Sequence, residues 1–479
     1  MVIRDWSSDV CSSDLKNSFN QKGCLLIGLF VFSIVWLVGA TIASQLMMWL
    51  MEQTLFEATF LFPDLRWLII LSYVILVGLP LIMIRFIVND QFINKIYQFW
   101  LTINFLGILI LPARFLTIND AFKVSLFQLF GISIYLTFLL IIYKRRNLSI
   151  YWKVKPELIW IPVSIASLYF LPWVLWGALG SALDLILNSM VGVLSGFLLT
   201  ICIQQLFIDL FPEDEKIPPE RNIFFGFIVL IGLIIFSTVF GLNGQQWLLV
   251  FTIPFSSWIV SGLFKNVGGE QSIFNSVWLL LTTIITAPLI WFDPDELSLL
   301  IGSESGEIFT WVSQVISYAV IILLFSTVLT GFLRKKVDEG KIKKPLMVFS
   351  LLIWVVVIII YALVGQPGLH GESLFVIMKD QVNLSEVNAL NDPIQKRDYV
   401  YLNSTDFAAQ SQANLTSFLT QFRIEYQPYY LVNALEVNAG PFWKWIIEQR
   451  DDVDRVLQNP NLRPLPEEIP VKSGNETSV

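Results

Sequence analysis

The stretch Tyr426-Gln-Pro-Tyr-Tyr-Leu-Val-Asn-Ala-Leu-Glu-Val-Asn-Ala-Gly440 has the composition of two short strands. Residues Ile424–Val437 are rich in Tyr, Val and Leu, and their apolar side chains alternate loosely, which is the period of a half-buried strand. Gly440 and Pro441 end this alternation and open a run that predicts a short helix over Phe442–Gln449. The stretch therefore predicts two strands, or one bent hairpin, followed by a helix.

Further elements flank this stretch on both sides. The segment Ser373–Lys379 predicts a strand, and Arg397–Phe422 predicts a long helix. After the short helix the apolar residues alternate again until Pro460. The order strand, helix, two strands, helix, strand is typical of a split βαβ or ferredoxin-like α+β domain, which we expect over residues 373–458.

The long helix carries side chains at helical spacing on one face, which predicts the stripe that lies on the sheet. The residues of this stripe are Val400, Phe407, Ser411, Leu415, Phe418, Leu419 and Phe422.

Two blocks in this region resemble the I9-type propeptide of subtilisin-family serine proteases. In that family Tyr-x-Pro-[Tyr/Phe]-x-[Leu/Val]-Asn-Ala is followed by a pair of valines three residues apart. Here the blocks are Tyr426-Gln-Pro-Tyr-Tyr-Leu-Val-Asn433-Ala434 and Asp452-Val-Asp-Arg-Val456. The resemblance covers about Ser373–Pro466 and depends on the first block, because the order of strands and helices is shared by many unrelated proteins. An unrelated small α+β domain is the alternative.

The resemblance implies a domain that assists the folding of a subtilisin-like protease domain and inhibits it. In that family the sheet packs on the protease, and the tail lies in the substrate cleft as an added strand. The resemblance implies that the strands of this sheet are Phe375–Met378, Ile424–Tyr429, Leu431–Val437 and Val453–Leu457. The protease domain, expected in cis, is missing here, so we expect a fragment of a membrane-anchored precursor. The tail 459–479 would lead to that domain, with inhibitory candidates Asn459, Leu462 and Leu465. The protease-docking candidates are Tyr426, Tyr429, Tyr430, Val432, Asn433 and Leu435.

The rest of the chain has the composition of a polytopic membrane protein. Hydrophobic residues make up 55% of the 479 residues and charged residues 14%, whereas a soluble protein carries about 25% charge. The net charge of −7 argues against nucleic acid as a partner. Residues 16–364 contain about eleven apolar runs of spanning length. These are Leu25–Ala43, Trp67–Val88, Phe99–Phe115, Ser125–Tyr143, Leu158–Leu179, Leu185–Phe207, Ile223–Leu242, Trp247–Phe264, Ile273–Phe292, Phe309–Phe332 and Leu346–Val364.

Basic residues in the short loops predict the orientation of these spans. Lysines and arginines gather before the first run, between the fourth and fifth, and between the tenth and eleventh. With eleven spans these loops share one side, so the N-terminus is expected in the cytoplasm of a multi-pass cell-membrane protein. After the linker 365–372, the α+β domain is expected outside the cytoplasm.

Residues 1–15 are expected to be an artefact. The segment Asp5-Trp-Ser-Ser-Asp-Val-Cys-Ser-Ser-Asp-Leu15 is similar to a translated sequencing adapter. Cys24 and Cys202 then remain, each inside an apolar run, and two isolated cysteines make neither a disulfide framework nor a metal site. We expect no metal and no cofactor.

Catalysis by this chain is not expected. A subtilisin-type site needs a serine, a histidine and an aspartate within reach of one another, but the one histidine, His370, lies in the linker. Two other functions stay open. A transporter or channel-like protein would need polar groups that converge within the membrane, where Arg114 is one candidate near a span end. A binding module for another partner would need an exposed apolar patch.

Overall fold

The computed structural model describes residues 18–57, 64–88, 90–115, 121–145, 159–177, 182–211, 219–240, 245–264, 274–292, 305–338, 343–364 and 374–458. These residues belong to two compact units, which are described separately. The first unit comprises Met1–Pro294 and Gly306–Val356, and the second comprises Asp295–Ser305 and Val357–Val479. The adapter-like segment, the linker with His370 and the predicted tail residues Asn459, Leu462 and Leu465 lie outside the described residues.

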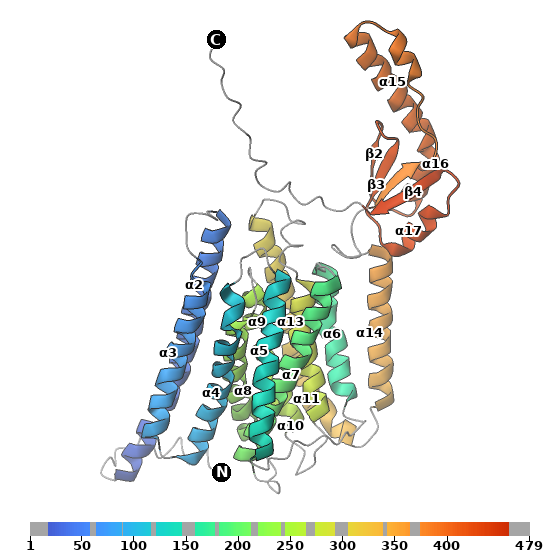
Figure 1. Cartoon of the computed structure of the whole chain (residues 1–479). Helices are drawn as coiled ribbons and strands as arrows, with labels where there is room; N and C mark the ends of the chain where they lie inside the picture. The colour runs from blue at the N-terminus through green and yellow to red at the C-terminus, as the bar shows by residue number, and fades with distance from the viewer. Residues whose placement is uncertain are drawn as a thin grey trace, which may run out of the picture. The chain divides into compact units, whose positions relative to one another are not determined.

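The first unit is built from long apolar helices (Figure 1). They are α2 (Ser18–Glu57), α3 (Arg66–Ile87), α4 (Gln91–Ile110) with η1 (Leu111–Phe115), α5 (Ala121–Arg145), α6 (Trp160–Trp176), α7 (Ala182–Leu210), α8 (Pro219–Val239), α9 (Gln245–Thr252) with η2 (Ile253–Ser256) and α10 (Ser257–Phe264), α11 (Phe274–Trp291), α13 (Ser305–Asp338) and α14 (Lys343–Val364), whose last turns belong to the second unit.

Ten helices in the described part of the chain are long and apolar enough to cross a membrane. The chain is therefore a membrane protein, as its composition predicted. The predicted fifth span, Leu158–Leu179, corresponds to α6, a helix of 17 residues, which is shorter than the roughly 20 residues that a crossing needs. The structure thus gives ten helices of spanning length where the sequence predicted eleven spans.

The predicted span Trp247–Phe264 is not one continuous helix. It consists of α9 and α10 joined by the 3-10 turn η2, which contains Pro254. Proline lacks an N–H group and its ring collides with the preceding turn, so the α-helical hydrogen bonds are interrupted here. Ser256 and Ser257 at this break are fully buried.

Helices α7 and α11 pack closely through small residues. A side chain at Gly192 would collide with Thr286, and one at Gly196 would collide with Thr282. Spacing of four residues places both glycines on one face of α7. The pair is a small-xxx-small contact, which lets two helix backbones approach each other in a membrane protein.

The second unit contains a small α+β domain. Its elements are β1 (Leu374–Met378), η3 (Ser385–Ala389), α15 (Pro393–Ser411), α16 (Ala413–Gln421), β2 (Tyr426–Tyr429), β3 (Ala434–Val437), α17 (Pro441–Glu448) and β4 (Val453–Gln458). The four strands form an antiparallel sheet in the order β2-β3-β1-β4. The predicted order of elements is therefore present, with strands 1 and 3 at the centre of the sheet.

The predicted boundaries differ most from the structure in the long helix and in the third strand. The long helix begins at Pro393, because the side chain of Asp392 accepts a hydrogen bond from the Ile394 amide and proline suits the first helical position. It divides at Gln412 into α15 and α16. The prediction that Leu431–Val437 is a strand was wrong for its first three residues, which form the turn before β3.

One face of the sheet carries the hydrophobic core of the domain. Strand β1 contributes Leu374, Val376 and Met378, and these pack with side chains from α16 and α17. Two residues of the predicted stripe, Leu415 and Leu419, are fully buried there. The last residue of the stripe, Phe422, is 47% exposed. The buried positions in α15 are the small residues Ser404 and Ala408, which permit close packing.

Candidate functional site

The face of the sheet opposite the hydrophobic core is the candidate binding surface of this domain. In an antiparallel sheet, residues directly opposite each other point to the same face. Phe375 lies opposite Glu436 on one side and Leu457 on the other, and Ile377 lies opposite Ala434 and Arg455. Their side chains alternate with the core residues of β1. We call the surface formed by Phe375, Ile377, Gln427, Tyr429, Glu436, Arg455 and Leu457 the open face.

The open face has an apolar centre and a polar border. Phe375 and Ile377 are half-buried on the central strand, and Leu457 on the edge strand β4 is 45% exposed. Gln427 and Glu436 lie on one side of this centre and Arg455 on the other. An apolar centre within a polar rim is the usual arrangement of a protein–protein interface.

Tyr429 is held on the open face by two contacts. Its ring lies 5.8 Å from the ring of Phe375, and its hydroxyl donates a hydrogen bond of 2.9 Å to Glu436 Oε2. This hydrogen bond to a carboxylate raises the pKa of the Tyr429 phenol above its ordinary value. The ring is therefore oriented before any partner arrives, which lowers the entropy lost on binding.

The turn between β2 and β3 adds a second exposed apolar region. Leu431 is 65% exposed and Val432 51% exposed. Tyr430 packs edge-on against Tyr401 of α15, and these tyrosines line a hollow of about 580 Å³ together with Val400 and Leu431. The turn thus carries large apolar side chains that the domain core does not use.

Asn433 closes this turn from inside the domain. Its φ of 38° lies in the left-handed region, which asparagine tolerates better than most residues. Its side chain accepts hydrogen bonds from Ser411 Oγ and Gln412 Nε2 and donates one to the carbonyl of Asp380. Asn433 therefore joins α15, the turn and the end of β1, and its side chain is buried.

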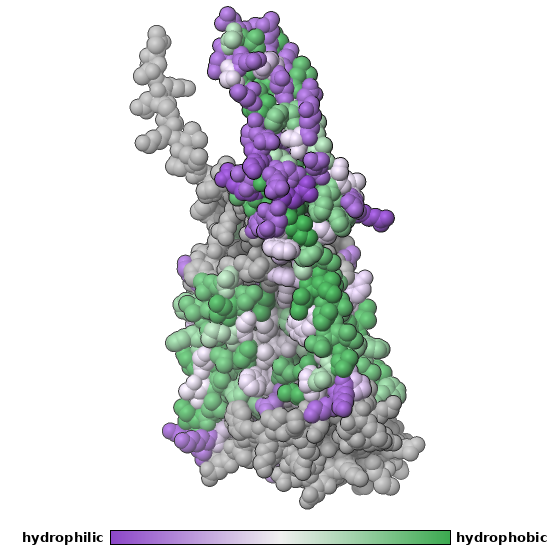
Figure 2. Space-filling view, turned by 90° about the vertical axis from the view of Figure 1, so that its right-hand side faces the viewer, coloured by the Kyte–Doolittle hydropathy of each residue, from purple (hydrophilic) through white to green (hydrophobic). Residues whose placement is uncertain are grey.

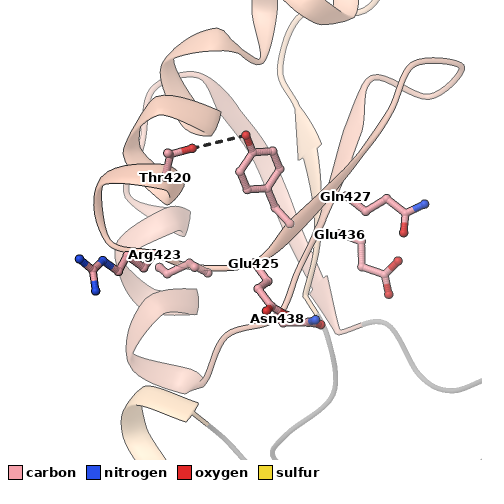
Figure 3. Close-up of a pocket in the computed structure, with 8 residues that line it drawn as sticks. Thr420, Arg423, Glu425, Gln427, Glu436 and Asn438 are labelled. Carbon is pink, nitrogen blue, oxygen red and sulfur yellow. Dashed lines mark hydrogen bonds between the residues drawn. The ribbon is translucent and has the colours of Figure 1, made fainter.

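A polar hollow lies between α16 and the edge strand β2 (Figure 3). It has a volume of about 720 Å³, and Arg423, Glu425 and Gln427 contribute to its lining. The hydroxyl of Tyr426, which also lines the hollow, is 3.4 Å from Oγ1 of Thr420 on α16. The described lining residues offer hydrogen-bond donors and acceptors at a sheet edge, so this hollow is suited to binding a polar group.

The structure separates the six predicted docking residues into four groups. Tyr429 lies on the open face, and Tyr430 and Val432 lie on the exposed turn. Tyr426 points to the core side of the sheet, where it packs on the core cluster. Leu435 and Asn433 are corrected from docking residues to structural residues, since both side chains are buried inside the domain.

Sequence reasoning missed the centre of the open face. Phe375, Ile377 and Leu457 were absent from the predicted docking residues, although each occupies a strand position. For Phe375 and Ile377 the signal was the continuous apolar run Leu374–Met378, because every second residue of a strand faces away from the core and here those residues are apolar too. Side-chain identity alone did not show which of the two faces the helices would cover.

A second group of buried polar residues lies in the first unit. Glu52 of α2 accepts a hydrogen bond of 2.7 Å from Gln246 Nε2 of α9. Arg114 of η1 is 2% exposed and donates to the carbonyl of Val239, and its Nε and Nη1 atoms have no hydrogen-bond partner among the residues described. Arg66, also buried, pairs with Asp64 at 2.6 Å. Buried charges within membrane segments are uncommon and are often functional.

Within the described ranges, no group of three or more His, Cys, Asp or Glu side chains is placed to hold a metal ion. Comparison of the chain with protein-family models, with curated proteins and with solved structures returned no match in any of the three.

Proposed function

We propose that the C-terminal domain is a propeptide-like module that docks on a subtilisin-like protease domain through its open face. In this role it would assist the folding of the protease and inhibit it. The observation that carries the proposal is the open face itself, with its apolar centre of Phe375, Ile377 and Leu457 and its oriented Tyr429. A sheet that is covered by helices on one side and apolar on the other needs a partner for the second side.

The proposal also includes a ferredoxin-like fold for the domain and a position outside the cytoplasm. The antiparallel order β2-β3-β1-β4, with helices between β1 and β2 and between β3 and β4, supports a ferredoxin-like arrangement. We place the domain outside the cytoplasm, which requires the shorter helix α6 to complete an eleventh crossing, because only with eleven crossings do the basic loops of the membrane part share one side. The membrane helices would then hold the module at the cell surface, close to the protease domain that it serves.

The test uses the full chain in lipid nanodiscs, titrated into a subtilisin-type protease with a chromogenic peptide substrate. We expect inhibition that saturates with one domain bound per protease. Tyr429→Asp and Leu457→Asp should each raise the inhibition constant by roughly 30-fold, since a well-packed interface residue contributes about 2 kcal/mol.

Leu402→Asp is the matched control for these substitutions. Leu402 lies on α15, is 58% exposed and is outside the open face, so its replacement should leave inhibition unchanged. If the wild-type chain does not inhibit at any concentration, or if all three variants inhibit alike, then the open face is not a protease-docking surface. The domain would then be a binding module for another class of partner.

The buried polar group in the first unit favours a second candidate function, transport of a small anion. The Nε and Nη1 nitrogens of Arg114 have no hydrogen-bond partner among the described residues. Glu52 of α2 and Gln246 of α9 are also buried and are hydrogen-bonded to each other. A guanidinium held away from water attracts an oxyanion strongly.

Proteoliposomes loaded with chloride, acetate or phosphate test this second function. Arg114→Gln should abolish the flux of the transported anion, and Arg85→Gln, which replaces an exposed arginine in the last turn of α3, should not. Absence of flux in the wild-type protein, or equal flux in both variants, would exclude the anion pathway.

A further inference from the structure

Helix α17 carries two aromatic side chains that its own domain leaves exposed. Phe442 is 42% exposed and Trp445 is 61% exposed. They are three residues apart, so they share one face of the helix. The opposite face is occupied, because Ile447 is fully buried in the domain core and the Trp443 ring lies 5.1 Å from the ring of Phe422.

The N-terminal end of α17 contacts the last turn of α14 within the second unit. The backbone N–H of Gly440 donates a hydrogen bond of 3.2 Å to the carbonyl of Leu363. Both residues belong to this unit, which includes Val357–Val364. Carbonyls in the last turn of a helix have no partner within the helix, and here one of them is satisfied by the residue that precedes α17.

Leu363 is also the last residue of the apolar segment Lys343–Leu363, one of the helices of spanning length. The end of such a segment marks the boundary between the hydrocarbon core and the lipid headgroups. Gly440 therefore lies at this boundary. At 1.5 Å per residue, Trp445 is at most about 8 Å along α17 from Gly440, and the headgroup layer on each side of a bilayer is roughly 5–8 Å thick.

We propose that α17 lies on the lipid surface and inserts Phe442 and Trp445 among the headgroups. Tryptophan is enriched at this depth because its ring is apolar and its N–H can still meet water or lipid oxygens. The paired Lys444 and Glu448, which are 3.8 Å apart, lie on the same short helix and keep its flank polar. The contact fixes one edge of the C-terminal domain at the membrane surface.

This inference is independent of the protease partner and of the side of the membrane. The lipid-facing residues belong to α17, whereas the open face consists of strand residues. Loss of inhibition would not affect the lipid contact, and loss of the lipid contact would not exclude inhibition.

The experiment places an environment-sensitive fluorophore on α17 of the full chain. In a background with Cys11→Ser, Cys24→Ser and Cys202→Ala, Trp445→Cys is labelled with a nitrobenzoxadiazole probe in phosphatidylcholine nanodiscs. Leu402→Cys is the matched control, because Leu402 is 58% exposed and lies on α15. Quenching is measured with aqueous iodide and with lipid that carries a nitroxide on its headgroup.

We expect the probe at position 445 to be quenched by the nitroxide lipid and to be several-fold less accessible to iodide than the probe at 402. Phe442→Cys, labelled in the same way, should reproduce this pattern, which guards against a local effect of replacing the tryptophan. Equal iodide access at 445 and 402 without lipid quenching would overturn the proposal. Shielding from iodide without lipid quenching would also overturn it, since a second copy of the chain would then cover α17.

Discussion

The two units of this protein distribute polar and apolar side chains in opposite ways. In the first unit, exposed leucines, isoleucines and phenylalanines cover the helices, and Arg114, Gln246 and Ser257 are buried between them. In the C-terminal domain the core is apolar and the surface is mainly hydrophilic, as Figure 2 shows for one side of each unit. Apolar side chains are stable on a surface that contacts lipid tails, whereas a surface that contacts water is more stable when it is polar.

This difference shows in which unit an exposed apolar side chain indicates a binding surface. On a membrane helix it is the normal lipid-facing state, so it identifies nothing further. On the water-exposed domain, the exposed Leu457, Leu431 and Trp445 have no such explanation within the domain. They mark the places where a partner, either a protein surface or the lipid headgroups, can bind.

The largest effect is expected inside the domain core. Leu435→Ala removes a fully buried side chain and should destabilise the domain by about 2–5 kcal/mol, because it leaves a cavity. Leu431→Ala, four residues earlier and 65% exposed, is the matched control. Hydrogen exchange of the β1 and β3 amides in the full chain measures the difference. Equal exchange rates in both variants would indicate that Leu435 is not part of the domain core and would contradict its structural role.

The next largest effect is expected where two membrane helices meet. Gly192→Leu places a side chain against Thr286 and should cost about 1–3 kcal/mol through overpacking. Gly39→Leu on α2 is the control, since an added Cβ there meets no atom within 4 Å. Thermal unfolding in detergent should show a lower Tm for Gly192→Leu only. A similar Tm for both variants would show that α7 and α11 do not depend on this close approach.

The sequence predicted which parts of the chain form helices and strands better than it predicted their faces. Apolar length identified the membrane helices, period-2 alternation identified β2 and β4, and a short apolar run identified β1. The sequence did not show that Pro254 divides a span into two helices instead of only bending it. The outcome depends on which neighbouring helices supply hydrogen bonds to the backbone groups that proline leaves without partners. Nor could the sequence show that Gln412 divides the long helix, where its side chain bonds to the turn.

The candidate site was predicted only in part for the same reason. All six docking candidates were taken from the stretch Tyr426–Leu435, yet three of them, Tyr426, Asn433 and Leu435, point into the domain. The open face is assembled from strands far apart in the chain, with Phe375 beside Leu457. Such pairs depend on strand order and register, which local patterns do not specify.

A smaller effect is expected at the turn that holds Tyr430 and Val432. Asn433→Ala removes the hydrogen bonds to Ser411, Gln412 and Asp380 and should cost about 1–2 kcal/mol, because buried partners lose their bonds. Asn438→Ala, at an exposed position, is the control. Protease sensitivity of the β2–β3 turn in the full chain should rise for Asn433→Ala alone. An unchanged cleavage rate would show that the turn is held by the backbone and not by this side chain.

The smallest effect concerns the hydrogen bond that orients Tyr429 on the open face. The bond to Glu436 raises the pKa of the Tyr429 phenol, so Glu436→Gln should lower that pKa toward the ordinary value. A raised folded-state pKa means that the bond stabilises the domain below the unfolded-state value of about 10 and that this contribution is lost as the pH rises through the folded-state value. Carbon-13 NMR of labelled tyrosine in the full chain measures the titration. Tyr399, whose pKa is raised by its bond to Glu386, is the internal control and should not respond. If both tyrosines shift together in Glu436→Gln, the variant has altered the whole domain, and the orientation of Tyr429 cannot be assigned to this one bond.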